Sequence, residues 1–362
     1  MKYIDEYRDP DLVAGLQNRI GKAAGHMSCP VTIMEICGSH TYAIGRFGIR
    51  KLLPENIRLV SGPGCPVCVT STRDVDIALY LAGLKDVIFA TFGDMLRVPG
   101  TGSDSLQKKR AEGCDIRVVS SADECMALAQ SNPRKEIIMM GIGFETTTPT
   151  IAATVEVCRK KNIQNFSVFS VHKIVPPAIA ALIADPLLKI DAFLCPGHVS
   201  TMIGSATYQM IPDAGCAAVI AGFEPVDILE SIWMILEQLR SNKKEVAIQY
   251  NRGVKPEGNV RAMAFLQSVF RTADAEWRGL GTIPASGLVF RGDYSGFDAL
   301  TKFAIPEILS SDIKGCGCGD ILRGIKAPQD CLLFKTVCTP LNPVGPCMVS
   351  SEGTCSTHYK YY

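Results

Sequence analysis

Short apolar runs recur along the chain, and each is followed by a turn and then by a segment with helical spacing. The apolar runs are VTIMEI (31–36), IRLVS (57–61), DVIFATFG (86–93), EIIMMGIG (136–143), FSVFSV (166–171), DAFLC (191–195) and CAAVIAG (216–222). Helical spacing is found in 74–84, 121–131, 149–161, 175–185 and 226–241. Continuous β-branched runs are typical of parallel strands buried on both faces. The alternation therefore predicts an α/β fold with parallel sheets and helical crossovers.

The same pattern divides the chain into three parts. Residues 1–145 and 146–300 have similar layouts, and each predicts one parallel-sheet α/β domain. From Ile313 onward Gly, Pro and Cys dominate and the helical periodicity fades. Residues 301–362 therefore predict a small irregular module that is held together by something other than an apolar core.

Charge and hydropathy exclude several classes of function. The sequence holds 37 Lys and Arg against 36 Asp and Glu, a formal net charge of +1, so no strong field attracts nucleic acid or an anionic membrane. No apolar run reaches the ~20 residues that cross a bilayer. The first residues lack the apolar centre of a signal peptide. We expect a soluble, cytoplasmic protein with no nucleic-acid or membrane partner.

Fifteen cysteines need an explanation in a reducing compartment, where stable disulfides are disfavoured. Six of them lie in the irregular C-terminal part: Cys316, Cys318, Cys331, Cys338, Cys347 and Cys355. Thiolates bind iron–sulfur clusters and zinc strongly, and zinc sites often show two tight C-x-x-C-like pairs. The gaps here are longer. They favour a cluster wrapped by an irregular loop over zinc, and zinc over free or disulfide-bonded thiols.

Cys65 and Cys68 form a C-x-x-C pair in the turn SGPGCPVCVTS, between a predicted strand and a predicted helix. Backbone N–H groups at a helix start favour a thiolate, and two thiols at this spacing can close a disulfide. A zinc site would need a second pair, and none occurs in the α/β part. The motif favours a redox or metal role, with the packing of two small buried side chains as the structural alternative.

Four further candidates follow predicted strands. Cys37 and His40 in CGSH could bind one metal, or the imidazole could activate the thiol. Glu145 in GFETTTP could be a base, orient a neighbouring ligand or cap a helix, and His198 lies in the similar turn PGHVS. Because ligands bind outside the carboxyl ends of parallel strands, we expect these turns to converge. Ordinary structural roles for each residue stay as the alternative.

Taken in order, the motifs resemble those of one family. MEICGSHT, SGPGCPVC, FGDMLRVPG, GFETTTP, DAFLCPGHVS, VIAGFEP, EWRGLG, CGDILRG and MVSSEGTC together resemble the HypD family of [NiFe]-hydrogenase maturation factors. The resemblance implies two α/β domains and a C-terminal [4Fe–4S] module. It also implies a scaffold on which an iron with two cyanides and one carbon monoxide is assembled, with redox chemistry in place of ordinary enzymatic turnover.

The resemblance assigns roles to residues of this sequence. Cys37 would hold the iron jointly with a cysteine of the partner HypC, and a second partner, HypE, would supply cyanide, with HypF upstream. The C-x-x-C pair of the family corresponds to Cys65 and Cys68, and from its redox chemistry we expect this pair to switch between dithiol and disulfide. The residues that would line the same cleft and orient ligands or handle protons are His40, Glu145 and His198.

The resemblance also implies the ligands of the [4Fe–4S] cluster. They are Cys318, Cys331, Cys338 and Cys355, with Cys316 and Cys347 as spare thiols or alternative ligands. One position departs from the pattern of some members: Tyr42 stands where a second histidine follows the first. A mechanism that needs an imidazole at this position therefore does not apply here.

Two other functions fit parts of the sequence. A stand-alone thiol–disulfide oxidoreductase would use Cys65 and Cys68 and would turn over a disulfide substrate without a partner. A zinc-stabilised binding module would use the C-terminal thiols and have no redox role. Metal analysis of anaerobically purified protein distinguishes these functions, because a [4Fe–4S] module carries about four irons and a structural site carries about one zinc.

Overall fold

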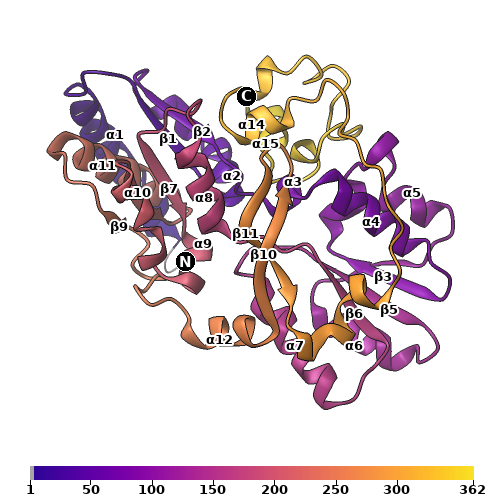
Figure 1. Ribbon diagram of the computed structural model, residues 1–362. Coiled ribbons are helices and arrows are strands. Elements are labelled where there is room, and N and C mark those ends of the chain that lie inside the picture. Colours follow the sequence, from indigo (N-terminus) through magenta and orange to yellow (C-terminus); the bar gives the residue numbers. More distant parts are fainter. Residues whose placement is uncertain (1–3) are drawn as a thin grey trace.

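The computed structural model describes residues 4–362 and contains two parallel sheets, an antiparallel hairpin and an irregular C-terminal module (Figure 1). The first sheet has the strand order β2-β1-β7-β8-β9, and its neighbouring strands are parallel. Its strands are β1 (Val31–Glu35), β2 (Ile57–Ser61), β7 (Ala192–Pro196), β8 (Ala217–Ala221) and β9 (Val246–Ile248).

The second sheet has the order β4-β3-β5-β6 and is also parallel. Its strands are β3 (Val87–Thr91), β4 (Ile116–Val118), β5 (Glu136–Gly141) and β6 (Phe166–Ser170). All seven apolar runs of the sequence form strands, and the predicted α/β class is confirmed. The sequence pattern missed β4, because this short edge strand buries only Ile116 and exposes Arg117 and Val118.

Helices cover both sheets, and they include all five that the apolar spacing predicts. The helices α1 (Pro10–Ala24) and α11 (Pro225–Ser241) pack on one face of the first sheet. One face of the second sheet is covered by α6 (Ala122–Ser131), α7 (Thr148–Lys160) and α12 (Val260–Val269). The remaining faces of both sheets share one apolar core with α4 (Thr72–Ala82), α5 (Leu106–Ala111) and α8 (Val175–Ala184). The two sheets therefore meet across a common interior.

The two sheets are interleaved along the chain. The first sheet takes β1 and β2 from the N-terminal part and β7 to β9 from residues 192–248, and the second sheet takes the strands between them. The division at residue 145 that the sequence layout indicates falls between β5 and β6, which pair from Ile137 with Phe166 to Gly141 with Ser170. The sheets therefore do not follow that division. The reason is that β7 pairs with β1, a long-range contact that no local pattern encodes.

An antiparallel hairpin joins the two halves. It consists of β10 (Phe270–Trp277) and β11 (Gly281–Phe290) and runs between the two sheets (Figure 1). One β-bridge, Thr70 with Trp277, ties the hairpin to the segment just after the Cys65–Cys68 pair. A second, Lys173 with Gly287, ties it to the turn after β6. No helix in residues 4–362 combines the length and the apolar character needed to cross a lipid bilayer.

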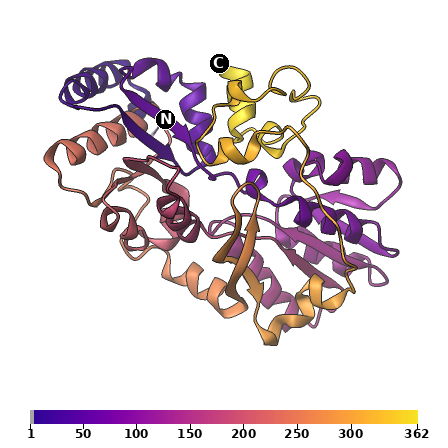
Figure 2. The same ribbon diagram turned by 45° about the horizontal axis from the view of Figure 1, so that its top comes forward.

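The C-terminal module lies over the junction of the two halves (Figure 2). It contains α14 (Cys318–Leu322) and α15 (Thr354–Tyr361) and follows α13 (Ala299–Lys302). The other short helices are α2 (Gly38–Arg46), α3 (Pro66–Val69), α9 (Gly197–Ile203) and α10 (Met210–Asp213). The module packs through α15 against α2, and through the turn Pro346–Met348 against α3. It therefore covers both thiol motifs of the first sheet.

Candidate thiol and metal centre

Cys37 lies where the first sheet meets the C-x-x-C turn. It joins β1 to α2 in extended backbone, and it is 8% exposed. The Gly38 N–H donates to the Gly64 carbonyl at 2.8 Å, and a Cβ on Gly38 would lie 3.2 Å from the Cβ of Cys65. The CGSH and GPGCPVC turns are thus in contact, as their positions after the neighbouring strands β1 and β2 predict.

Cys65 and Cys68 face each other at the start of α3. Cys65 precedes the helix, and its Sγ accepts the Cys68 N–H at 3.3 Å. The two Sγ atoms are 2.6 Å apart, and both side chains are buried. Burial raises the pKa of Cys68 well above its ordinary value. The pair therefore has the proximity that a dithiol–disulfide couple needs, inside an environment that excludes water.

All six cysteines of the C-terminal module line one cavity. They are Cys316, Cys318, Cys331, Cys338, Cys347 and Cys355. The Sγ atoms of Cys318 and Cys347 are 2.8 Å apart, and the Cys347 thiol also lies near the thiols of Cys68 and Cys355. Sulfur atoms therefore form a continuous series from the Cys65–Cys68 pair through Cys347 into this cavity, which we call the thiol cavity.

The donor set of the thiol cavity is compatible with an iron–sulfur cluster. Soft thiolates around an apolar cavity are the donors that iron–sulfur clusters use. A glycine makes room for one of the sulfurs, because a Cβ on Gly345 would lie 2.7 Å from the Cys316 Sγ.

Glu352 of the C-terminal module closes over Cys37. It accepts the Ser39 hydroxyl at 2.6 Å, and a Cβ on Gly38 would lie 2.7 Å from its Cβ. Burial first, and the charge of Glu352 second, raise the pKa of Cys37 to about 12, although the His40 and Ser39 N–H groups oppose them. A thiolate at this position therefore needs a nearby cation. Sequence reasoning did not single out Glu352, although the motif MVSSEGTC contains it.

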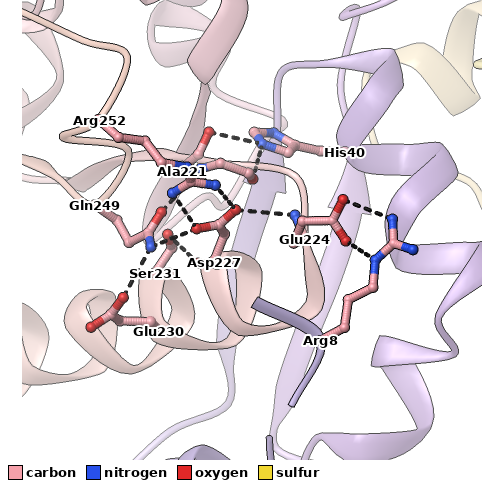
Figure 3. Close-up of polar contacts among 10 residues, drawn as sticks. Arg8, His40, Ala221, Glu224, Asp227, Glu230, Ser231, Gln249 and Arg252 are labelled. Carbon is pink, nitrogen blue, oxygen red and sulfur yellow. Dashed lines mark hydrogen bonds and ion pairs between the residues drawn. The ribbon is translucent and has the colours of Figure 1, made fainter. Parts of the chain in front are cut away.

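The two histidines predicted as site residues share one aromatic neighbour. The His40 Nε2 lies 3.0 Å from the Gly222 carbonyl oxygen and 3.3 Å from that of Ala221, so this nitrogen donates (Figure 3). His40 and His198 both stack on Phe223, with ring centroids 4.8 and 3.9 Å apart. Burial lowers the pKa of His40 to about 4 and also lowers that of His198. Both imidazoles are therefore neutral near pH 7.

An ionic network fixes the loop that carries this aromatic ring (Figure 3). Arg252 donates to both carboxylate oxygens of Asp227, at 2.8 and 2.6 Å, and Gln249 donates to the same carboxylate at 2.9 Å. Asp227 also accepts the Glu224 N–H at 3.1 Å, and Glu224 pairs with Arg8. Because the buried carboxylate is satisfied on every side, the loop before α11 is held in one conformation.

Glu145 lies in the turn between β5 and α7 and is buried. Its Oε1 accepts the Val175 N–H at the start of α8 at 2.9 Å, and its Oε2 has no hydrogen-bond partner among the described residues. Glu145 therefore caps α8. It also lies near the buried Tyr208, whose pKa is raised mainly by burial and further by the charges of Glu145 and Cys37. The role of Glu145 in the chemistry stays a prediction.

Glu145 is expected to make stability depend on pH. Burial raises its pKa from 4.5 to about 7, so between these values the folded protein keeps a proton that the unfolded chain releases, and stability falls as pH rises. The side chain of Glu145→Gln cannot ionise, so this variant does not lose stability in this way. The difference in free energy of unfolding between Glu145→Gln and wild type should therefore increase by about 3 kcal/mol from pH 4.5 to about pH 7. Urea unfolding at these two pH values measures it. Glu55→Gln, at an exposed position, should show no such trend, and equal trends would contradict the assignment.

A cleft between the sheets opens beside the thiol pair. Its lining comes from the first sheet, the second sheet and the C-terminal module: Cys65, Phe92, Asp94, Gly143, Thr147 and Glu352. Of the predicted turns, GPGCPVC and GFETTTP line this cleft, and CGSH contacts the GPGCPVC turn. The side chains of His40, Glu145 and His198, which we expected in one cleft, are not among its lining residues. His198 is connected to His40 of the CGSH turn through Phe223, on which both imidazole rings stack.

Comparison with known proteins identifies the family of this chain. The HypD family model, described as "Hydrogenase formation hypA family", matches residues 11–362. The chain belongs to the HypD family. It is 44% identical to "Hydrogenase maturation factor HypD2" of Bradyrhizobium diazoefficiens, over 100% of this chain and 97% of that protein. It is also 46% identical to "Hydrogenase expression/formation protein HupD" of Azotobacter chroococcum and 43% identical to "Hydrogenase maturation factor HypD" of Cupriavidus necator, with the same coverage. The resemblance drawn from the motifs is confirmed, and the protein is a hydrogenase maturation factor.

Proposed function

We propose that this protein is the scaffold on which the Fe(CN)2CO fragment of [NiFe]-hydrogenase is assembled in the cytoplasm. Cys37 holds the iron together with a cysteine of HypC, and cyanide arrives on HypE, with HypF acting upstream. Family membership supports the process. The single observation that carries the residue assignment is the contact between the Cys37 turn and the Cys65–Cys68 turn.

The iron fragment is the cargo, and the surroundings of Cys37 suit its capture. An iron ion supplies the positive charge that the buried thiol lacks, so binding releases the thiol proton. Glu352 lies beside Cys37, and burial raises the pKa of its carboxyl group, which makes its carboxylate a stronger base for that proton. The neutral rings of His40 and His198 can orient ligands of the iron without adding charge.

The thiol series provides a route for electrons. When Cys65 and Cys68 close a disulfide, they release two electrons and two protons, and reduction of that disulfide takes them up again. Cys318 and Cys347 form a second close pair. A dithiol at one pair can therefore reduce a disulfide at the other by exchange through Cys68 and Cys347, which conserves atoms and electrons.

Cys331, Cys338 and Cys355 would serve as three ligands of the [4Fe–4S] cluster, which when bound would supply electrons one at a time for reduction of the disulfide. The family resemblance gives Cys318 as the fourth. The contact of Cys318 with Cys347, and the room that Gly345 leaves for the Cys316 sulfur, favour Cys316 in its place. Cys318 is then free to act with Cys347 in exchange.

The fourth ligand can be identified by two matched substitutions. Cys316→Ser is expected to lose most of the iron and sulfide and the brown absorbance of anaerobically purified protein, because an oxygen ligand replaces a soft thiolate. Cys318→Ser is expected to keep about four irons, as wild type does. Iron and sulfide analysis with visible absorption spectra measures both. The reverse pattern would return Cys318 to the ligand set, and a colourless wild type with zinc would refute the cluster itself.

A stand-alone thiol–disulfide oxidoreductase is less well supported. Such an enzyme presents a reactive thiol to its substrate, whereas Cys65 is 4% exposed and Cys68 is fully buried. The pair lies beneath the C-terminal module and beside Cys37, which suits electron transfer inside the protein. Turnover of a disulfide substrate without HypC would favour the oxidoreductase.

A further inference from the structure

We propose that the Arg278 guanidinium compensates the negative charge of the thiol cavity and thereby raises the reduction potential of the cluster bound there. The inference rests on the proposed function, because it needs a cluster. It assigns a residue of the EWRGLG motif that neither the thiol series nor the iron site uses.

Arg278 is anchored between the two thiol systems. It follows β10, its backbone N–H donates to the Val69 carbonyl at 2.9 Å, and its Nε donates to the Thr70 carbonyl at 2.9 Å. The next residue, Gly279, touches the module, because a Cβ on it would lie 2.2 Å from the Cα of Gly319. The side chain is therefore fixed by the segment just after the Cys65–Cys68 pair and by the start of α14.

The guanidinium is buried and lies near two cysteines of the thiol cavity. Arg278 is 7% exposed and lines one pocket with Cys316 and Cys318. Its Nη2 is buried and has no hydrogen-bond partner in residues 4–362. A buried cation with an unpaired donor is costly unless negative charge lies nearby. Thiolates that hold a metal cluster are such a charge.

The only carboxylate paired with Arg278 among the described residues does not cancel this charge. Asp312 lies 3.6 Å from Nη1, and its side chain is 67% exposed, so water screens it. The Thr72 hydroxyl donates a hydrogen bond to the same oxygen of Asp312, so Arg278 is not the only partner of that carboxylate. Asp320 lines the same pocket but is paired with Lys326. The charge of Arg278 is therefore only partly cancelled by carboxylates, and it acts on the nearby thiols through a medium of lower effective dielectric constant than water.

The sign of the effect follows from charge. Reducing a four-thiolate cluster by one electron adds one negative charge to the cavity, and net charge is one of the factors that set cluster potentials. A buried cation stabilises the reduced state more than the oxidised state. Loss of Arg278 should therefore make the midpoint potential more negative, and loss of Asp312 should make it slightly more positive.

The test is a reductive titration of the anaerobically purified full chain with dithionite, followed by electron paramagnetic resonance. Arg278→Met should raise the oxidised-to-reduced ratio at a fixed ambient potential at least tenfold, about 59 mV for one electron. Arg278→Lys keeps the charge and should stay closer to wild type. Asp312→Asn should shift the midpoint in the opposite direction. Lys326→Met removes an exposed cation of the same module and should shift it far less.

The outcomes separate the two proposals. If wild type and Arg278→Met bind the cluster and share one midpoint potential, the inference about Arg278 is wrong and the proposed function stands. Equal shifts in Arg278→Met and Lys326→Met would also overturn it, since they would reflect net charge alone. If wild type holds no iron–sulfur cluster, the proposed function fails first. If Arg278→Met does not fold, Asp312→Asn is compared with wild type and with Lys326→Met. A midpoint potential of Asp312→Asn that is equal to or lower than that of wild type would then refute the inference about Arg278.

Discussion

Replacing Cys37 by alanine is expected to abolish the infrared bands of iron-bound cyanide and carbon monoxide in the anaerobically purified complex with HypC. The thiol is the soft ligand at the junction of the two turns, and the groups around it favour a thiolate only when a cation is present. Without the sulfur, the iron keeps only the ligand from the partner. The loss should be complete within detection, and hydrogenase maturation in cells should fail with it.

A matched control is available in the same chain. Cys29 is exposed and lies before β1, so Cys29→Ala removes a thiol without touching the junction and should keep the bands at full strength. Copurification with HypC and the iron content of the thiol cavity show whether Cys37→Ala has folded. Bands that persist at wild-type strength in Cys37→Ala would exclude this residue as an iron ligand.

Gly64→Ala is expected to damage both the fold and the site. A Cβ at this position would lie 2.2 Å from the backbone nitrogen and 2.4 Å from the Cα of Cys37, and backbone atoms cannot move aside as a flexible side chain can. The turn before Cys65 must therefore separate from the start of α2. Because overpacking of this kind costs about 1–3 kcal/mol or more, urea unfolding should show a loss of at least about 2 kcal/mol, and iron capture at Cys37 should weaken.

Gly21→Ala is the control for this substitution. Gly21 lies inside α1, and nothing lies within 4 Å of an added Cβ. Alanine at an open helical position stabilises by about 1 kcal/mol. The two glycine substitutions should thus have effects of opposite sign. A Gly64→Ala protein as stable as Gly21→Ala would mean that the CGSH and GPGCPVC turns do not touch.

The strands were predictable because their signal is local. The run EIIMMGIG and its neighbours are apolar on both faces, which parallel strands between helices require, and each became a strand. The order of the strands was not predictable from the same signal. Nothing in 31–35 indicates that β1 pairs with β7 as well as β2, because the partner lies more than 150 residues away.

The site was predictable where chemistry and position coincide. Cys37, Cys65 and Cys68 are unusual residues in strand-end turns, and the structure brings the two turns together. The sequence did not indicate Glu352 or Phe223 as site residues, because nothing distinguishes this glutamate or this phenylalanine from others in the chain. Only the fold places them beside Cys37 and His40. The position of Cys347 next to Cys68 also depends on how the C-terminal module docks, which spacing within that module cannot show.

The interleaved connectivity imposes an order on biosynthesis. A nascent chain emerges N-terminus first, and its domains fold as units as they become available. The sheet that carries Cys37 is incomplete until residues 192–248 have left the ribosome, whereas the other sheet can close once residue 170 has emerged. Glu352, which covers the cysteine, is translated more than 100 residues after β9, the last strand of that sheet. The surroundings of Cys37 are therefore incomplete on a polypeptide that stalls before Glu352, and we expect such a chain not to assemble the proposed iron site.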